Sequence, residues 1–393
     1  NILICCGVLA RNGLTTAFLN LLEHVDKKKR NYFVTFVKSG LKRDPLRVKQ
    51  LPSWVGIVPI SGFFGRTPLE VIATVLYFRK NKKNDWIIKY VDRYYSREFY
   101  KHYGSCDYEY VIHYSGYGEK MLTMFQNANR KNIVFVHNDM VKELEGKSNQ
   151  HALTVKRAYA SYYKVVPVTT DIYAPTYELG KNEKNIQVVN NCHDYKGVLN
   201  KSNKKVKFDE KTVCSISEEE LCEILDSSEN KFITIGRFSY EKGHRMLIDA
   251  FDRYYERKKE GYLIIIGGYG PLYSETLEYA QSLESRNRII IIHYMSNPMP
   301  VLKQCDLFIL SSIYEGLGLV ILEADTLGIP AISTDIPGPR GFMREHGGYL
   351  VEPNSEGIYE GMMAFNRGEV HAMNVNYEEY NRIAVEQFEQ LFK

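Results

Sequence analysis

The sequence has 393 residues, a length that favours two or three domains. Its 44% hydrophobic and 25% charged residues are ordinary for a globular protein with a large core, and its net charge of +4 gives no indication of nucleic-acid binding. Because no apolar run reaches the ~18 residues that a membrane-spanning helix needs, and no signal peptide is visible, the composition argues against a membrane-spanning protein.

Short β-branched segments alternate with longer amphipathic segments through the first half of the sequence. The predicted strands are 1–6, 31–37, 108–113, 131–137, 163–169 and 185–190, and a helix is predicted over 13–25. Such alternation implies a parallel sheet that is covered by helices on both faces.

A polar and charged stretch, 196–230, interrupts this pattern and contains one predicted short helix at 217–226. The alternation then restarts, with predicted strands at 231–236, 262–267, 288–295, 306–311 and 329–334 and helices at 242–258, 318–327 and 377–392. We therefore predict an α/β fold with two doubly wound domains, 1–195 and 196–376. Ligands of such sheets bind beyond the carboxyl ends of the strands.

Seven cysteines are spread along the chain, at positions 5, 6, 106, 192, 214, 222 and 305. Their odd number, without a C-x-x-C motif or a His pair at zinc spacing, predicts buried reduced thiols in a cytosolic protein. Since the sequence starts at Asn1 rather than Met, we expect a trimmed chain or a piece of a longer polypeptide.

The stretch GRFSYEKG, at 236–243, joins a predicted strand to a predicted helix. Gly236 and Arg237 follow the strand, and Lys242 begins the helix. Two cations beside the N–H groups of a helix N-terminus suit a diphosphate. The alternative is that Arg237 forms a surface ion pair and that Lys242 is a solvated residue of the first turn.

A second loop of this kind, IIIGGYGPLY at 264–273, also joins a strand to a helix. Gly267, Gly268 and Gly270 would let the backbone approach a ligand closely, and Pro271 suits the first helical position. A tight turn without a ligand accounts for these residues equally well.

The stretch SIYEGLGLVILEA, at 312–324, carries two glutamates in apolar surroundings. Glu315 precedes a predicted helix, beside the N–H groups of residues 316–319, and Glu323 lies inside that helix. Carboxylates accept hydrogen bonds from hydroxyl groups and N–H groups bind phosphate, so the stretch suits a polyol attached to a diphosphate. The alternative is that Glu315 caps the helix and that Glu323 faces solvent.

In order and spacing, residues 231–334 resemble the retaining glycosyltransferases of family 4, which have the GT-B fold. The resemblance rests on GRFSYEKG, GGYGP and the pair Glu315 and Glu323, separated by seven residues after a glycine-bearing loop. It implies two Rossmann-like domains that face a central cleft and hold a nucleotide-sugar there.

The resemblance also implies roles for residues of the second domain. Glu323 would bind the ribose hydroxyls, Glu315 the donor sugar, and Arg237 and Lys242 the diphosphate. The remaining donor-binding backbone would be that of Gly236, Gly268, Gly316, Leu317, Gly318 and Leu319.

In the first domain the resemblance is looser. The segment RNG, ending at Gly13, resembles the family's first glycine loop, which approaches the donor phosphate and the acceptor, and His137 resembles a histidine near the donor sugar. VVNNCHD at 188–194 resembles the family's Asn-Gly-x-Asp segment, with Asn191 in place of the glycine. The final helix, within 377–393, would pack back onto the first domain.

Two segments depart from the family's pattern or add to it. DIPGPRGFM, at 335–343, carries Arg340 where the family often has two glycines and an acidic helix start, and it would serve an anionic acceptor or form a different turn. Residues 86–122 loosely resemble enzymes of teichoic-acid and capsule assembly.

The resemblance implies that a sugar moves with retention from a nucleoside-diphosphate sugar, in the first place a UDP-sugar, to a hydroxyl of a glycan, teichoic acid or lipid-linked acceptor. The sequence has no D-x-D motif, the nearest match being Asp107-Tyr-Glu109. We therefore predict no essential metal and no cofactor. Two other functions stay open, namely a nucleotide-sugar epimerase of the same fold and a non-catalytic sugar-binding module of a larger synthase.

The stretch TPLEVIATVLYFRKNKKNDW, at 67–86, combines an apolar helical segment with a basic end. Arg79, Lys80, Lys82 and Lys83, followed by Trp86, suit the surface of an anionic membrane at the cytoplasmic face. The alternative is that the helix packs on the sheet and that the basic residues complement its dipole.

Overall fold

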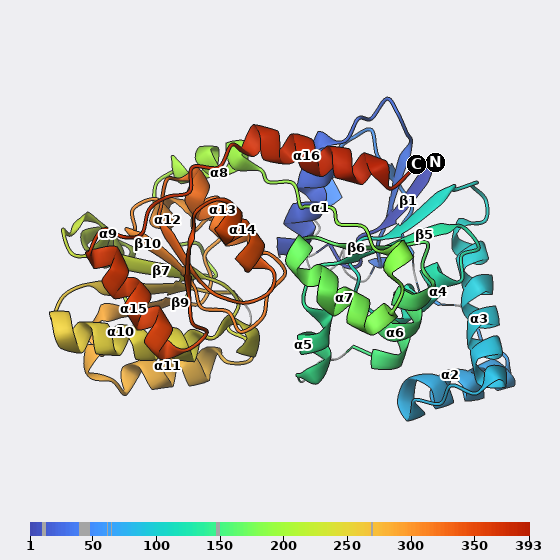
Figure 1. Cartoon of the computed structure of the whole chain (residues 1–393), viewed down its shortest axis with the longest axis horizontal. Coiled ribbons are helices and arrows are strands. Elements are labelled where there is room, and N and C mark those ends of the chain that lie inside the picture. Colours follow the sequence, from blue (N-terminus) through green and yellow to red (C-terminus); the bar gives the residue numbers. More distant parts are fainter. Residues whose placement is uncertain (10–12, 39–47, 61, 64, 147–149, 269) are drawn as a thin grey trace. The chain divides into compact units, whose positions relative to one another are not determined.

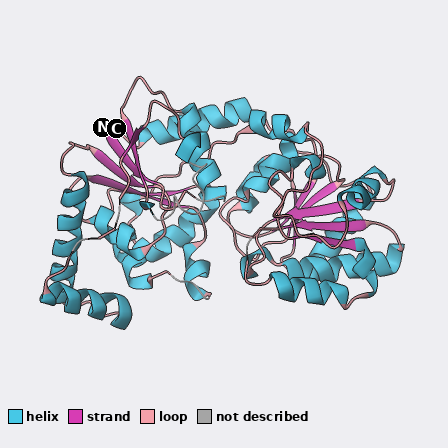
Figure 2. Ribbon diagram, turned by 180° about the vertical axis from the view of Figure 1, so that it is seen from behind, coloured by secondary structure: helices cyan, strands magenta, loops and turns pink. Residues whose placement is uncertain are grey.

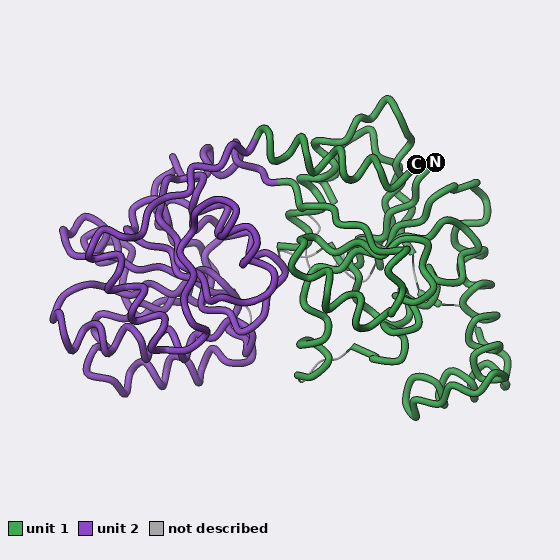
Figure 3. The backbone as a smooth tube through the Cα atoms, in the orientation of Figure 1, with its two compact units in different colours: residues 1–192, 378–393 green, residues 193–377 purple. Residues whose placement is uncertain are grey.

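The structure is a computed structural model that describes residues 1–9, 13–38, 48–60, 62–63, 65–146, 150–268 and 270–393. The chain divides into two compact units (Figure 3). Unit 1 comprises Asn1–Cys192 and Glu378–Lys393, and unit 2 comprises His193–Tyr377.

The described part of unit 1 is built on a six-stranded sheet with the order β3-β2-β1-β4-β5-β6 (Figure 1). Neighbouring strands are parallel throughout. The chain runs outward from β1 to β3 and then crosses back to β4, so the topological switch point lies between β1 and β4. The strands are β1 (Ile2–Cys5), β2 (Tyr32–Thr35), β3 (Gly56–Ile57), β4 (Tyr110–His113), β5 (Lys131–Val136) and β6 (Lys164–Pro167).

Helices cover both faces of this sheet, with α1 and α16 on one side and α3, α4 and α6 on the other (Figures 1 and 2). The helices of unit 1 are α1 (Gly13–His24), α2 (Pro68–Lys80), α3 (Asp85–Tyr103), α4 (Glu119–Gln126), α5 (Met140–Glu145), α6 (Ala152–Ser161) and α7 (Tyr173–Gly180), together with α16 (Tyr377–Gln390) from the end of the chain. Phe388 and Leu391 of the final segment belong to the hydrophobic core of unit 1.

The described part of unit 2 repeats this topology, with the sheet order β12-β11-β10-β7-β8-β9. Its strands are also parallel, and the switch point lies between β7 and β10. The strands are β7 (Lys231–Ile235), β8 (Tyr262–Ile266), β9 (Ile289–Ile292), β10 (Leu307–Leu310), β11 (Ala331–Thr334) and β12 (Tyr349–Val351).

In Figure 1, helices α10, α11 and α15 lie on one side of this second sheet and α12, α13 and α14 on the other. Because both faces are covered, strands such as β9 and β10 are buried along their whole length and are apolar at every position. The helices of unit 2 are α8 (Tyr195–Ser202), α9 (Glu218–Asp226), α10 (His244–Lys258), α11 (Tyr273–Gln281), α12 (Met299–Leu302), α13 (Leu319–Thr326), α14 (Pro339–Glu345) and α15 (Ser355–Asn366).

The predicted α/β architecture with two doubly wound halves is confirmed, but one predicted strand is wrong. Residues 185–190 form no strand. They run beside β6, where Gln187 N donates to Val165 O at 3.0 Å and Val189 N donates to Pro167 O at 3.1 Å. The stretch is extended, as its β-branched residues favour, but its pairing is too short for a ladder.

All seven cysteines lie within the described residues and are free thiols. Cys5, Cys6, Cys192 and Cys305 are buried. Among the described residues, no helix is both long and apolar enough to cross a bilayer.

Candidate active site

The residues after β7 and after β10 form the centre of the candidate site. These two strands are neighbours at the switch point of unit 2, so the loops at their carboxyl ends meet. The loop after β7 carries Gly236, Arg237 and Lys242, and the loop after β10 carries Glu315.

Close backbone contacts hold the two loops together. Ile313 N donates to Glu241 O at 2.8 Å, and Ser311 Oγ donates to Lys242 O at 2.9 Å. Gly243, with φ at +61°, makes the approach possible, because a Cβ at this position would lie 2.1 Å from Ser311 O. Lys242 thus ends a short 3₁₀ turn, Tyr240–Lys242, two residues before α10 begins, rather than opening the helix as predicted.

Lys242 and Glu315 form an ion pair between Nζ and Oε2, and both side chains are only 19% exposed. Ser312 Oγ lies 3.4 Å from the same carboxylate oxygen. Gly236 leaves room for the lysine, since a Cβ there would lie 3.3 Å from the Cδ of Lys242. The ammonium group of Lys242 is therefore already paired with the carboxylate of Glu315. An anion that binds Lys242 must bind it alongside this carboxylate.

Arg237 points elsewhere. It is two-thirds exposed, and its guanidinium donates to Glu241 Oε1 at 2.9 Å. The same oxygen accepts a hydrogen bond from Ser239 Oγ at 2.5 Å. Arg237 therefore has the surface ion pair that the sequence left open as an alternative. Sequence reasoning missed Glu241, although its position four residues after Arg237 was a signal for this pair.

The backbone of Gly316, Leu317, Gly318 and Leu319 leads directly into α13. Gly318 is the N-cap residue, with φ at +78°, and the first turn carries neither a capping side chain nor an acidic residue. The first N–H groups of a helix have no partner within the helix, and its dipole favours a negative charge there. This backbone can therefore donate to an anion.

Glu323 lies in the second turn of α13 among the buried residues Ile321, Leu322 and Ala324, and its own side chain is half-buried. Burial raises the pKa of this carboxyl to about 7, with Lys201 lowering it and Asp194 raising it by smaller amounts. A carboxyl with this pKa changes its charge near neutral pH. Of these two charged neighbours, Lys201 lies in the last turn of α8 and Asp194 caps its start, and the sequence did not reveal that α8 packs on α13.

Neighbouring residues of α13 fix the helix in place. Asp325 is buried and accepts hydrogen bonds from Asn374 N at 2.7 Å, Val375 N at 3.0 Å and Tyr377 Oη at 2.9 Å. Thr326 Oγ1 lies 2.8 Å from His193 Nε2. These contacts position the helix that carries Glu323.

The glycine loop after β8 is explained mostly by packing. A Cβ at Gly267 would lie 2.0 Å from the ring of Phe238, and one at Gly270 would lie 2.0 Å from Phe238 O. A Cβ at Gly268 would meet no atom within 4 Å, so this residue borders open space. Gly267 and Gly270 are thus explained by a tight turn without a ligand, whereas the space beside Gly268 could accommodate one.

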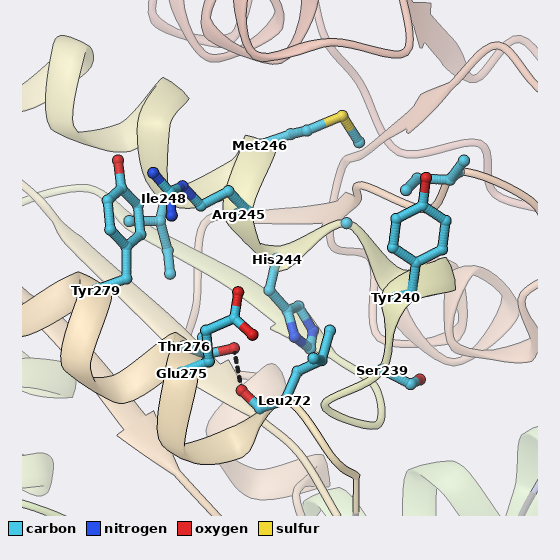
Figure 4. A pocket seen from close by; sticks show the side chains of 12 residues that line it. Ser239, Tyr240, His244, Arg245, Met246, Ile248, Leu272, Glu275, Thr276 and Tyr279 are labelled. Carbon is cyan, nitrogen blue, oxygen red and sulfur yellow. Dashed lines mark hydrogen bonds between the residues drawn. The ribbon is translucent and has the colours of Figure 1, made fainter. Parts of the chain in front are cut away.

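A pocket of about 290 Å³ lies between the starts of α10 and α11 (Figure 4). Its lining includes Tyr240, His244, Thr276 and Ile313, but neither Lys242 nor Glu315. His244 is buried, and its pKa is lowered to about 3 by burial and by Lys242. The pocket borders the candidate site without containing its charged pair.

His137, in unit 1, follows β5 and is half-buried. Its Nε2 lies 2.6 Å from Tyr114 O, and because a carbonyl only accepts, Nε2 carries the proton and Nδ1 keeps a lone pair. Burial lowers the pKa of the ring to about 4, against the opposing effect of the hydrogen bond to Tyr114, so His137 is neutral at pH 7.

Two further predicted segments are 11–13, in unit 1, and 188–194, whose last two residues, His193 and Asp194, begin unit 2. Gly13 is the exposed first residue of α1, whereas Arg11 and Asn12 lie outside the described residues. Asn191 is buried and accepts a hydrogen bond from Tyr114 Oη at 3.4 Å. Asp194 caps α8 by accepting from Gly197 N at 2.8 Å.

The divergent segment 335–343 forms a turn and the first part of α14. Arg340 forms an ion pair with Asp335 Oδ1, and its Nη2 donates to Asp335 O at 2.9 Å. The arginine therefore stabilises its own turn. Among the described residues, no group of three or more His, Cys, Asp or Glu side chains could hold a metal ion.

Comparison with known proteins shows what this arrangement is similar to. Residues 218–382, less than half of the chain, match the family model for Glycosyl transferases group 1. This segment contains Arg237, Lys242, Glu315 and Glu323.

Two curated relatives match part of the chain. N-acetyl-alpha-D-glucosaminyl L-malate synthase of Bacillus anthracis is 29% identical over 189 residues, which are 48% of this chain and 46% of the relative. The N-acetylgalactosamine-N,N'-diacetylbacillosaminyl-diphospho-undecaprenol 4-alpha-N-acetylgalactosaminyltransferase of Campylobacter jejuni is 29% identical over 137 residues, 34% of this chain and 36% of the relative. The matches thus span less than half the length of either relative.

A solved structure shares the fold along the whole chain. Anabaena Alr3699/HepE in complex with UDP-glucose superposes with a TM-score of 0.66 at 16% sequence identity, covering 100% of this chain and 98% of that one. The fold is therefore that of the GT-B glycosyltransferases, with two α/β units of the doubly wound type.

Proposed function

We propose that this chain is a retaining glycosyltransferase. It moves a sugar from a nucleoside-diphosphate sugar, in the first place a UDP-sugar, to a hydroxyl of a cell-surface glycan, a teichoic acid or a related acceptor. The observation that carries the proposal is the Lys242–Glu315 pair at the switch point of unit 2, beside the start of α13. The match of the segment that contains this pair to Glycosyl transferases group 1 supports it.

In this proposal, unit 2 binds the donor. Lys242 and the N–H groups at the start of α13 hold the diphosphate, and Arg237 turns from Glu241 to add a second cation. Glu323 accepts hydrogen bonds from the ribose hydroxyls. Glu315 binds the donor sugar and orients Lys242, since both act through one ion pair.

The reaction breaks the bond between the anomeric carbon and the phosphate oxygen, whose electron pair leaves with the diphosphate. The acceptor hydroxyl attacks from the same face and forms the new glycosidic bond, so the anomeric configuration is kept. Its proton passes to the departing phosphate oxygen. Lys242 and the start of α13 stabilise the negative charge that develops there, without an essential metal.

His137 and Gly13 contribute from the first domain, 1–195, which we assign to the acceptor. The neutral imidazole of His137 keeps the lone pair of Nδ1, which can accept a hydrogen bond from a sugar hydroxyl. Gly13 opens α1, whose uncharged first turn suits an anionic group. The second domain, 196–376, would then be the donor domain.

We place the reaction at the cytoplasmic face of a membrane, with a lipid-linked or surface glycan as acceptor. The seven free thiols suit a reducing compartment. The name of the Campylobacter jejuni relative describes transfer to a diphospho-undecaprenol-linked sugar. The name of the Bacillus anthracis relative describes transfer to L-malate, so the test includes soluble acceptors.

The proposal is tested by a thermal-shift panel of nucleotide-sugars, because a ligand that binds the folded state raises its melting temperature. The best stabiliser is then incubated with the protein, and the products are separated. Release of nucleoside diphosphate together with a glycoside supports the proposal. An epimerised nucleotide-sugar without transfer would indicate the epimerase, and binding without turnover of any acceptor would indicate the non-catalytic module.

A further inference from the structure

Helix α2 exposes four aliphatic side chains, whereas two polar side chains, Glu70 and Thr74, are buried on its inner face. Leu69, Val71, Ile72 and Val75 are 40–49% exposed. The face that packs against α3 instead carries Glu70, Ala73, Thr74 and Tyr77, all at most 2% exposed. A helix on the surface of a globular protein normally shows the reverse pattern.

The inward polar side chains of α2 have partners that hold the helix in this orientation. Glu70 binds Arg97 of α3 through both oxygens, at 2.7 and 2.9 Å, and Arg66 donates to Thr74 Oγ1 at 2.8 Å. Thr67 and Glu70 complete a capping box at the start of the helix. Rolling α2 to bury its aliphatic side chains would leave the carboxylate of Glu70 without its partner. The outward apolar face is therefore a fixed feature of unit 1.

The segment after this face is basic and exposed. Arg79 and Lys80 end α2, Lys82 and Lys83 follow, and Trp86, 44% exposed, lies in the first turn of α3. Within the described part of the chain, none of the four cations forms an ion pair. In Figures 1 and 2, α2 lies at the end of α3 that points away from the sheet of unit 1.

Charge is distributed unevenly between the two units. Unit 1 has 31 Lys and Arg against 20 Asp and Glu, a net charge of +11, whereas unit 2 has 20 against 27, a net charge of −7. The modest +4 of the whole chain hides this difference. The apolar face thus belongs to the half of the chain that is attracted to an anionic surface.

We propose that unit 1 docks on an anionic lipid bilayer through the α2 surface, which we define as Leu69, Val71, Ile72, Val75 and Trp86 together with Arg79, Lys80, Lys82 and Lys83. The aliphatic face enters the boundary between headgroups and acyl chains, and the four cations contact anionic headgroups. The indole of Trp86 suits the same depth. The reason for docking depends on the proposed function. The evidence for the contact with the bilayer is the α2 surface itself.

The sequence left two alternatives for this stretch, and the structure separates them. The helix does pack on the rest of unit 1, but through the face that carries Glu70, Ala73, Thr74 and Tyr77. The aliphatic face is left for a partner, and the cations beside it favour an anionic bilayer over a second copy of the basic unit 1, which would repel them.

The test is co-sedimentation of the full chain with vesicles of phosphatidylcholine, alone or mixed with phosphatidylglycerol, at low and at high salt. Binding is expected only to the mixed vesicles, and it should weaken as salt rises. The first variant, Leu69→Ser, Ile72→Ser and Val75→Ser, removes the apolar contact. Its matched control, Leu199→Ser, Val213→Ser and Ile383→Ser, removes aliphatic side chains that are similarly exposed elsewhere.

A second pair of variants tests the cations. Each basic residue near an anionic membrane surface strengthens binding about fivefold, so changing Arg79, Lys80, Lys82 and Lys83 to Gln should weaken vesicle binding by about 600-fold if the four contributions add. Changing Lys27, Lys28, Lys29 and Lys38 to Gln removes the same charge from exposed positions of unit 1 and should have a much smaller effect. Equal losses would mean that general attraction, not the α2 surface, causes binding.

Two further results would overturn the proposal: wild-type protein that stays in the supernatant with anionic vesicles at low salt, or an aliphatic variant that binds as well as its control. Circular dichroism melts check that each variant is folded. Self-association lost only in the α2 variants would indicate a second copy as the partner. Glu323→Ala should bind vesicles normally while losing donor affinity, so failure of docking and failure of the proposed function are distinguishable.

Discussion

Lys242 and Glu315 are the two residues on which the proposed reaction depends most. They form one ion pair, with four-fifths of each side chain buried, at the switch point of unit 2. Removing one partner from such a pair leaves the other charge uncompensated. In the proposed function, Glu315 binds the donor sugar and Lys242 its diphosphate, so the ion pair would couple the position of the sugar to phosphate binding.

Glu315→Gln should lower turnover far more than donor affinity. The amide keeps the size of the side chain but loses the charge that acts on the sugar in the transition state, so we expect kcat to fall by about 10²-fold or more while the donor Kd changes little. Steady-state kinetics and calorimetry on the same preparation measure the two quantities. A parallel loss of both would make Glu315 an ordinary binding residue.

Glu323 should make donor affinity depend on pH. With a pKa of about 7, the carboxyl is mostly protonated at about pH 6 and mostly ionised at about pH 8, so affinity should rise about tenfold over this range if only the carboxylate binds the ribose. Calorimetric titration of the donor at several pH values measures this slope. Glu323→Gln should bind weakly and without the slope. A wild-type affinity that is flat across this range would contradict the ribose assignment.

Ionisation of Glu323 at rising pH should have the opposite effect on the stability of the folded protein, which it lowers. Its pKa is about 7 in the folded protein against an ordinary value of 4.5, so the folded state binds the proton more tightly than the unfolded state. Its contribution is thus fully present below about pH 4.5 and is lost as pH rises through 7. Without ligand, Glu323→Gln should be more stable than wild type above pH 7, by about 1–3 kcal/mol, and should differ little near pH 4.5.

At the scale of elements, the loop after β7 depends on one glycine. Gly243→Ala places a methyl group at a positive φ and 2.1 Å from Ser311 O, whereas Gly328→Ala, at φ +73°, meets no atom within 4 Å. The control should cost about 1–2 kcal/mol from backbone strain, and Gly243→Ala at least ~1 kcal/mol more. Denaturant unfolding measures both. Equal costs would mean that the two loops are not held in contact.

The sequence predicted the elements whose residues carry a clear period and missed those without one. Buried apolar runs such as 289–292 and 307–310 indicate strands that are covered on both faces of the sheet. The edge strand β3 has only two residues, and β12 only three. Helix α8 lies in the polar stretch assigned to a boundary, although Asp194 three residues before Gly197 was a capping signal.

The sequence predicted where the candidate site lies, but not which of its residues contact one another. Lys242 and Glu315 each follow a predicted strand. Because the carboxyl ends of parallel strands lie at one edge of the sheet, the sequence predicted that both residues lie at this edge. Their pairing depends on β7 and β10 being neighbours in the sheet, because Lys242 and Glu315 are 73 residues apart in the sequence. The raised pKa of Glu323 depends on burial and on α8, neither of which a linear motif contains.

At the scale of the whole molecule, one topology occurs twice with different charge. Both units have the doubly wound strand order, yet unit 1 is net basic and unit 2 net acidic. A basic unit suits anionic acceptors and surfaces. In the acidic unit, Lys242 lies at the switch point, and under the proposed function this cation suits a donor that carries a diphosphate.

The central claim is that unit 2 activates a nucleotide-sugar through Lys242 without a metal. The most direct test is proton NMR of the best-stabilising donor with the protein and an acceptor, in the presence of EDTA. We predict release of nucleoside diphosphate and a product of unchanged anomeric configuration, at a rate that EDTA does not alter and that Lys242→Ala lowers strongly. An inverted product, activity that requires added magnesium or manganese, or a Lys242→Ala variant as fast as wild type would contradict the account.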